Sequence, residues 1–424
     1  MKNIIQSVRG TREFYPREMA LRNWLYQMIR TISESYGYQE YDGPFLETLD
    51  LYAAKSGEEL VKEQSFVFPD RGGEMITLRP ELTPSLARMV AQRQNQLVFP
   101  LRWWSFGPFW RYEKPQKGRT REFFQWNIDL IGVNSPEADA EIVAIACALL
   151  HASGLNPEQV RILISDRQLM LDQLNQMGLS EKQKAQAFKI IDRQDKLNPD
   201  AWEEFVLEQG WTRAQLNQLR DVLNNGKLWE QSPNLVRIFK LLEAYELKAY
   251  TAFDARIVRG LDYYTGIVFE ARDTAGSNRA IFGGGHYDNL VEDVGGQALP
   301  GVGFAMGDVV FPLVLEQCNI SPELEITAAK ILMTVFDENG VEYSIKIAAM
   351  LRLNGFDVQV YPEATKLGKQ FKYADRTEIR FVLVAGPDEI ASGTVQVKDL
   401  KTGGQEAVLV DKLVSALQGK IAVG

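Results

Sequence analysis

Two aromatic-rich segments joined by a basic stretch limit the fold of this chain more than any other feature of its sequence. Residues 103–112 and 123–131 have the composition of β-strands, and the ten residues between them are polar and largely basic. This order predicts an antiparallel hairpin. Most hairpin loops have about two to five residues, so a loop near ten predicts a tip with a function of its own.

The second of these strands carries polar side chains where a core strand would be apolar. Gln125, Asn127 and Asp129 alternate with bulky apolar residues, so all three lie on one face of the strand. That face is either exposed to solvent or the polar floor of a pocket. The apolar residues on the opposite face favour a buried sheet, and with it the pocket.

Length and composition describe an ordinary globular protein of several domains. At roughly 100–200 residues per domain, 424 residues predict two to four domains. Lysine and arginine number 47 against 56 aspartate and glutamate, and the net charge of −9 argues against a surface that coats nucleic acid, so any such site is local. Two cysteines and two histidines are too few for a zinc cluster, and we expect no metal centre built from protein side chains alone.

Two further patterns bear on location. Charged and polar residues run through the N-terminal segment, unlike a secretory signal. The longest apolar run, residues 142–150, is far shorter than the ~20 residues that cross a bilayer. We therefore expect a cytoplasmic protein with no membrane partner.

The spacing of apolar residues changes several times along the chain. An amphipathic helix follows Pro16, and a strand is expected over 38–46. Residues 166–247 have helical spacing throughout and predict a helical module, after which an extended segment returns at 255–258. From residue 330 strands and helices alternate, which predicts a small α/β domain with a mostly parallel sheet.

Three clusters of polar or glycine residues are candidates for chemistry. Glu81 and Thr83 place a carboxylate beside a hydroxyl, which suits a bound ammonium group, although Thr83 also suits a helix cap. The segment 259–266 sets two tyrosines between glycines, either as ligand-binding groups or as a packed loop. The glycines within 283–285 and 301–307 fit neither a dinucleotide fold nor a P-loop, but they leave room for a flat ligand against the backbone.

Taken together and in this order, these segments resemble the histidyl-tRNA synthetase family over essentially the whole chain. Residues 111–119 resemble the second signature motif of class II aminoacyl-tRNA synthetases, and residues 259–264 and 283–288 resemble two histidine-binding signatures of the family. Residues 367–371 and 393–399 resemble its anticodon-binding domain.

The resemblance implies a fold and a division into domains. An α+β catalytic domain on an antiparallel class II sheet occupies residues 1–165 and 248–322. A helical insertion occupies residues 166–247, and an α/β anticodon-binding domain occupies residues 328–424. The resemblance also implies that Pro44 belongs to a motif at a homodimer interface.

The implied reaction is the activation of histidine by ATP, with Mg²⁺ on the nucleotide, to histidyl-adenylate, and then transfer to the 3′ end of a tRNA. By motif position, the catalytic residues are Arg111 and Arg259 at the α-phosphate, and Arg119 also binds ATP. Histidine is bound by seven residues: Glu81, Thr83 and Gln125 at its amino group, Asp129 and Tyr264 at its imidazole, and Tyr263 and Tyr287 around them. The implied tRNA contacts are Lys114 and Gln116 at the hairpin tip, and Lys369 and Lys372 on a positive helix face.

Three positions depart from the family pattern. Val310 stands where the third motif of the family has an arginine for the ATP phosphates, His286 stands at another usual arginine, and Asp129 stands where glutamate is frequent. The missing arginine fits an alternative, the regulatory subunit of ATP phosphoribosyltransferase, a paralogue that does not charge tRNA. Arg259, the basic loop and the complete C-terminal domain favour the synthetase. A third interpretation, a tRNA-binding module without catalysis, leaves the polar clusters unexplained.

Overall fold

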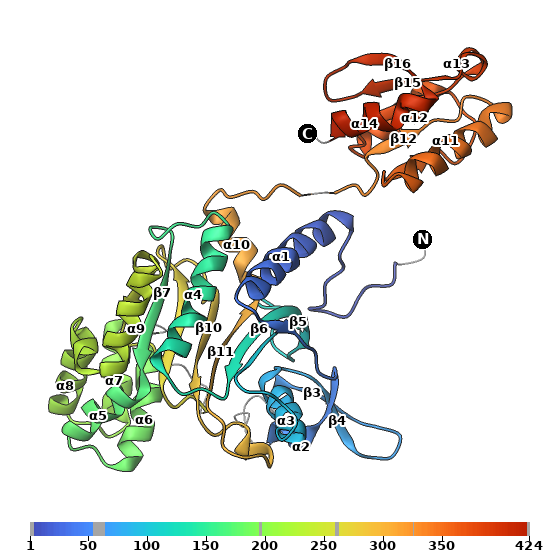
Figure 1. Ribbon diagram of the computed structural model, residues 1–424. Coiled ribbons are helices and arrows are strands. Elements are labelled where there is room, and N and C mark those ends of the chain that lie inside the picture. Colours follow the sequence, from blue (N-terminus) through green and yellow to red (C-terminus); the bar gives the residue numbers. More distant parts are fainter. Residues whose placement is uncertain (1–3, 54–63, 195–196, 259–262, 325, 422–424) are drawn as a thin grey trace. The chain divides into compact units, whose positions relative to one another are not determined.

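The chain forms two compact units. The computed structural model describes residues 4–53, 64–194, 197–258, 263–324 and 326–421. One unit comprises residues 1–13 and 22–322, and the other comprises residues 14–21 and 323–424 (Figure 1). The further division of the first unit into a catalytic part and a helical insertion at 166–247 stays a prediction.

An eight-stranded sheet is the framework of the first unit. Its strand order is β1-β5-β6-β11-β10-β9-β7-β8, and neighbours are antiparallel except for the parallel pairs β1–β5 and β7–β8 at its edges. The strands are β1 (Gln39–Glu40), β5 (Leu101–Trp110), β6 (Glu122–Ile131), β7 (Val160–Asp166), β8 (Thr251–Phe253), β9 (Ile267–Asp273), β10 (Phe282–Tyr287) and β11 (Gly301–Gly307). The predicted hairpin is β5 and β6, which pair from Leu101 opposite Ile131 to Trp110 opposite Glu122. The long loop between these strands is therefore confirmed.

Strand β6 separates the core from the candidate site. Trp126 and Ile128 are fully buried and belong to the main apolar cluster of the unit. The same cluster contains the apolar residues of α4 (Pro136–Ala152), which begins where the Ser135 side chain accepts a hydrogen bond from the Ala138 N–H. Helix α1 (Pro16–Ser35), expected from its apolar stripe, adds Leu25 to this cluster. Because side chains alternate along a strand, the polar residues of β6 face away from this core.

The first unit also contains a small three-stranded sheet of order β2-β4-β3. Its strands are β2 (Leu46–Thr48), β3 (Phe66–Pro69) and β4 (Met75–Leu78). The helix α2 (Leu49–Ala53) follows β2 in the chain, and α3 (Thr83–Arg93) follows β4. The expected strand over 38–46 is wrong, because β1 and β2 are short, separate strands in different sheets.

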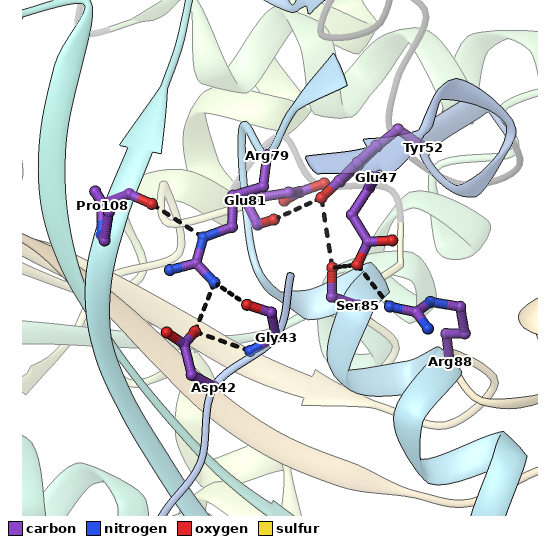
Figure 2. Close-up of polar contacts among 9 residues, drawn as sticks. All are labelled: Asp42, Gly43, Glu47, Tyr52, Arg79, Glu81, Ser85, Arg88 and Pro108. Carbon is purple, nitrogen blue, oxygen red and sulfur yellow. Dashed lines mark hydrogen bonds and ion pairs between the residues drawn. The ribbon is translucent and has the colours of Figure 1, made fainter. Parts of the chain in front are cut away.

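Arg79 explains the break between β1 and β2 (Figure 2). Its guanidinium donates to the Asp42 carboxylate at 2.6 Å, the Gly43 carbonyl at 3.0 Å and the Pro108 carbonyl at 2.9 Å. The side chain is fully buried between the rings of Phe45 and Phe109, each 4.5 Å from its central carbon. The side chain thus ties the turn after β1 to the end of β4 and to β5.

Helices fill the region expected to be a helical module. They are α5 (Arg167–Gln176), α6 (Glu181–Asp192), α7 (Pro199–Glu208), α8 (Arg213–Asn224) and α9 (Pro233–Ala244). The extended segment expected at 255–258 is wrong. The strand β8 ends at Phe253, and the Asp254 carboxylate then accepts from the Arg256 N–H at 2.9 Å, which stabilises a turn.

The second unit has its own five-stranded sheet of order β13-β12-β14-β15-β16. Its elements are β12 (Ile331–Met333), α11 (Val341–Leu353), β13 (Val358–Val360), α12 (Leu367–Arg376), β14 (Phe381–Val384), α13 (Pro387–Ser392), β15 (Thr394–Asp399), β16 (Gln405–Leu409) and α14 (Leu413–Ile421). The first three strands of the order are parallel, whereas β15 and β16 are antiparallel, and β16 had no counterpart in the sequence prediction. None of the described helices of either unit is long and apolar enough to cross a bilayer.

Candidate active site

A cavity of about 780 Å³ opens on the polar face of the large sheet. Gln125, Asn127 and Asp129 of β6 line it, so this face is the floor of a pocket and not a solvated surface. Strand β11 contributes small residues beside them, and a Cβ at Gly303 would collide with the Asp129 carboxylate. Glycine at this position therefore leaves the space in which a ligand can reach the floor.

Most of the residues expected to bind substrates lie together around this cavity. The lining includes Glu81, Thr83, Arg111, Arg119, Gln125, Asp129, Tyr263, Tyr264 and Tyr287. Lys114 and Gln116 are exposed at the loop tip and do not line it, and Lys369 and Lys372 are exposed on α12 of the second unit. Arg259 lies outside the described residues.

Asp129 is a buried carboxyl group of the cavity with a shifted pKa. It is 5% exposed, and the Tyr287 hydroxyl donates a hydrogen bond to it at 2.9 Å. Burial raises the pKa of Asp129 to about 7, and the hydrogen bond from Tyr287 only partly offsets this. A carboxyl group with this pKa accepts a hydrogen bond from a ring N–H and changes its charge near neutral pH.

Three tyrosines stand beside this carboxyl group. The rings of Tyr263 and Tyr264 are 4.8 Å apart, and those of Tyr263 and Tyr287 are 6.3 Å apart in an edge-to-face arrangement. Burial raises the pKa of Tyr263 well above its ordinary value, so its hydroxyl stays protonated as a donor. A Cβ at Gly285 would lie 2.8 Å from the Tyr264 ring, which shows how closely this tyrosine packs on β10.

The Glu81 and Thr83 pair lies at the start of α3. The residue that precedes the helix is Leu82, and no side chain caps this end, so the capping interpretation of Thr83 is wrong. The Tyr52 hydroxyl donates to the Glu81 carbonyl at 3.1 Å and holds the backbone in place, as Figure 2 shows. Both residues line the cavity.

Two arginines of the β5–β6 loop also line the cavity. Arg111 donates through Nε to the Pro80 carbonyl at 2.9 Å and lies over the Phe123 ring. Arg119 pairs with Glu113 of the same loop at 2.8 Å. These two residues come from the loop that the sequence singled out.

Five charged residues of the lining escaped the sequence analysis: Asp192, Arg256, Glu270, Arg272 and Arg279. Glu270 and Arg272 are two positions apart on β9 and pair with each other at 2.5 Å. Their alternation on a strand was visible in the sequence, but only the pairing of β9 with β10 places that strand at the cavity.

The unusual His286 lies on β10 next to Tyr287, and side chains at adjacent strand positions point to opposite faces. The His286 imidazole is 2.8 Å from Asp139 of α4 and 3.3 Å from Asp288, and Asp288 also accepts from the Thr265 hydroxyl at 2.7 Å. Burial lowers the pKa of His286, but the hydrogen bonds and charges of the two aspartates outweigh it, and the pKa is raised. Through Asp288 this cluster holds Thr265, the residue directly after Tyr264, in place.

The other unusual segment follows β11. Asp308 accepts from the Phe124 N–H at 2.8 Å and pairs with Arg12 at 2.8 Å, whereas Val309 and Val310 line the cavity. No group of three or more His, Cys, Asp or Glu side chains suited to a metal ion occurs in the described part of the chain.

Comparison with known proteins gives a consistent result. A family model described as histidyl-tRNA synthetase matches residues 10–308, and one described as an anticodon-binding domain matches residues 327–420. Histidine--tRNA ligases of Leptospira biflexa and Thermoplasma volcanium are 36% and 37% identical to the chain, and the matches cover 94% and 98% of both partners. The crystal structure of histidyl-tRNA synthetase from Nostoc sp. PCC 7120 superposes with a TM-score of 0.83 at 25% identity and covers 99% of this chain and 100% of that one.

Proposed function

The chain belongs to the histidyl-tRNA synthetase family, and on that premise we propose that it is a histidine-tRNA ligase. It activates histidine with ATP to histidyl-adenylate and transfers the histidyl group to the 3′ end of a tRNA. The observation that carries this conclusion is the match to histidine--tRNA ligases along nearly the whole length of both chains.

The imidazole of histidine fits the end of the cavity with Asp129 and the tyrosines. Asp129 accepts from one ring N–H, and the Tyr264 hydroxyl bonds the other nitrogen. Both groups are buried, so an apolar ring of the same size would leave them without partners, and this cost rejects it. Tyr287 holds Asp129 in position, and Tyr263 closes the pocket.

The amino group of histidine fits Glu81, Thr83 and Gln125. A carboxylate, a hydroxyl and an amide oxygen together supply three acceptors for an ammonium group. This arrangement leaves the substrate carboxylate directed toward the arginine-lined end of the cavity.

The phosphates fit that end of the cavity. In the first step a carboxylate oxygen of histidine attacks the α-phosphorus, the bond to the β-phosphate breaks, and pyrophosphate leaves. Arg111 and Arg259 stabilise the charge that develops on the α-phosphate oxygens, and Arg119 exchanges Glu113 for the nucleotide. In the second step a ribose hydroxyl of tRNA attacks the activated carbonyl, and AMP leaves.

The nucleotide brings Mg²⁺, which neutralises phosphate charge. Magnesium in such sites is held by phosphates, water and one or two carboxylates, so it requires no cluster of protein ligands. Glu113 and Glu270 are carboxylates of the lining that fit this requirement.

The tRNA contacts in this proposal are local, in keeping with the acidic chain as a whole. Lys114 and Gln116 at the hairpin tip contact the acceptor stem. Lys369 and Lys372 on α12 contact phosphates of the anticodon region, and the match of the second unit to anticodon-binding domains supports this.

A homodimer is also part of the proposal. Four large apolar side chains of the small three-stranded sheet and the residue before it are 40–50% exposed, namely Phe45, Leu46, Phe68 and Met75. Their position next to Pro44 supports a second copy of the chain as the surface that covers them. Light scattering of the purified chain measures this directly.

Histidine-dependent exchange of pyrophosphate into ATP tests the proposed function. The ligase catalyses this exchange without tRNA and charges tRNA when it is added. A purified chain that binds histidine but catalyses no exchange would instead have the properties of the regulatory paralogue.

A further inference from the structure

The part of the cavity proposed to bind the ATP phosphates lacks a positive charge that the family pattern has there. Val309 and Val310 line it at the start of α10 (Val310–Gln317), where the family pattern has an arginine for the ATP phosphates. A triphosphate chain carries several negative charges and needs cations on more than one side. Arg111 and Arg119 approach from the β5–β6 loop, and Arg259 is proposed for the α-phosphate alone, which leaves the other phosphates with cations from one side only.

The sheet register places another arginine at the edge of the cavity floor. Strand β10 pairs with β11, and β11 pairs with β6, so residues of the three strands form rows across the cavity floor. At the edge of the floor Phe282 pairs with Met306 and Met306 with Trp126. Arg279, three residues before β10, and Val309, two residues after β11, therefore leave the sheet at the same edge, and both line the cavity. The Asp308 N–H donates to the Phe124 carbonyl at 2.8 Å, which shows that the β11–β6 pairing does continue.

Arg279 differs from the other lining arginines in its partners. Arg119, Arg256 and Arg272 each pair with a carboxylate. Arg279 is exposed, and it makes no ion pair or hydrogen bond with any residue that the structure describes. Its positive charge is therefore not neutralised, and its side chain can reach a ligand without breaking a contact.

We propose that Arg279 binds the phosphate chain of ATP and supplies, from the β9–β10 connection, the charge that position 310 lacks. It lies at the edge of the floor where β10 begins and β11 ends, whereas Arg111 comes from the β5–β6 loop, and both line the cavity. The phosphates then lie between two guanidinium groups that come from different segments of the chain. This assignment rests on the proposed function, in which ATP is a substrate.

Arg279→Ala tests the assignment in two ways. In pyrophosphate exchange, loss of a charge-assisted contact is expected to raise the KM for ATP about tenfold or more and to leave the KM for histidine unchanged. In calorimetry, the variant is expected to bind ATP more weakly than the unaltered chain and to bind adenosine equally well. Arg213→Ala is the matched control, since Arg213 is 80% exposed on α8 and does not line the cavity.

A second variant tests the equivalence of the two positions. Val310→Arg in the Arg279→Ala background restores an arginine at the family position, so recovered ATP affinity supports the assignment. Equal affinities of the unaltered chain and Arg279→Ala for ATP would overturn it, as would a rise in the KM for tRNA alone. A chain that binds ATP and discriminates these variants but shows no histidine-dependent exchange would refute the proposed function and leave this assignment standing.

Discussion

The variant Asp129→Asn separates the effect of this carboxyl group on the free energy of unfolding from its effect on histidine binding. The group is buried, and burial raises its pKa from 3.8 to about 7. The shift of about 3 units corresponds to about 4 kcal/mol that ionisation of Asp129 removes from the free energy of unfolding above pH 7. This value is an upper limit, since water that enters around the carboxylate reduces the cost.

The sign of the effect follows from proton binding. Between about pH 4 and pH 7 the folded chain holds a proton on Asp129 that the unfolded chain has lost. The free energy of unfolding therefore falls as the pH rises through this range and is constant, for this group, above it. Asparagine has nearly the same shape and no charge, so position 129 of the variant does not lower the free energy of unfolding as the pH rises.

Urea unfolding at pH 4, 6 and 8 measures the difference. All eight tryptophans of the chain lie within residues 22–322, so tryptophan fluorescence reports on the unit that contains Asp129. We expect Asp129→Asn to be more stable than the unaltered chain at pH 8, by as much as about 4 kcal/mol, and no such gain at pH 4. The same variant is expected to have a much higher KM for histidine at pH 8, because a neutral amide replaces the charged acceptor.

Asp129→Glu is the control, because it keeps the ionisable group. A stability difference between Asp129→Asn and the unaltered chain that is the same at pH 4 and pH 8 would refute the reasoning. So would an unchanged KM for histidine in the asparagine variant.

Three further predictions concern other parts of the chain. In NMR titration of the two histidines, the imidazole signal that His286→Ala removes is expected to titrate above pH 6.5, and Asp139→Asn is expected to lower its pKa; a pKa unmoved by Asp139→Asn would contradict the cluster. Arg79→Leu leaves two carbonyls without their donor and is expected to cost about 3 kcal/mol in urea unfolding, whereas a loss below about 0.5 kcal/mol would show that the clamp contributes little. Lys369→Ala and Lys372→Ala are expected to weaken tRNA binding and its salt dependence without changing pyrophosphate exchange, and unchanged salt dependence would exclude phosphate contacts there.

Local patterns were sufficient to predict the hairpin and the polar face of β6. The alternation of Gln125, Asn127 and Asp129 depends only on neighbours in sequence, and whether this face was a pocket floor or solvated surface depended on what lay above it. The prediction of one strand over 38–46 is wrong because it too depended on a contact that is distant in sequence. The strand is broken by the side chain of Arg79, some 35 residues away, which no local pattern reveals.

The position of Arg279 was also beyond the sequence. It belongs to the cavity because three strands from distant parts of the chain pair side by side, so that the connection before β10 leaves the sheet next to the turn after β11. Periodicity within each strand gives the face of a residue but not its neighbours on other strands. Charged residues in connections such as that between β9 and β10 therefore need the structure before they can be assigned.

Residues 79–81, which directly follow β4, connect the proposed dimer segment with two parts of the proposed active site. The Arg79 side chain holds the turn that precedes Pro44, the Pro80 carbonyl holds Arg111, and Glu81 lines the cavity where the amino group is proposed to bind. A movement of the proposed dimer segment thus reaches both the phosphate and the amino-group subsites within three residues of backbone. Because linkage is reciprocal, we expect histidine and ATP to change the dissociation constant of the dimer by the same factor by which dimerisation changes their affinities. Residues 79–81 would then couple substrate binding in one copy of the chain to substrate binding in the other.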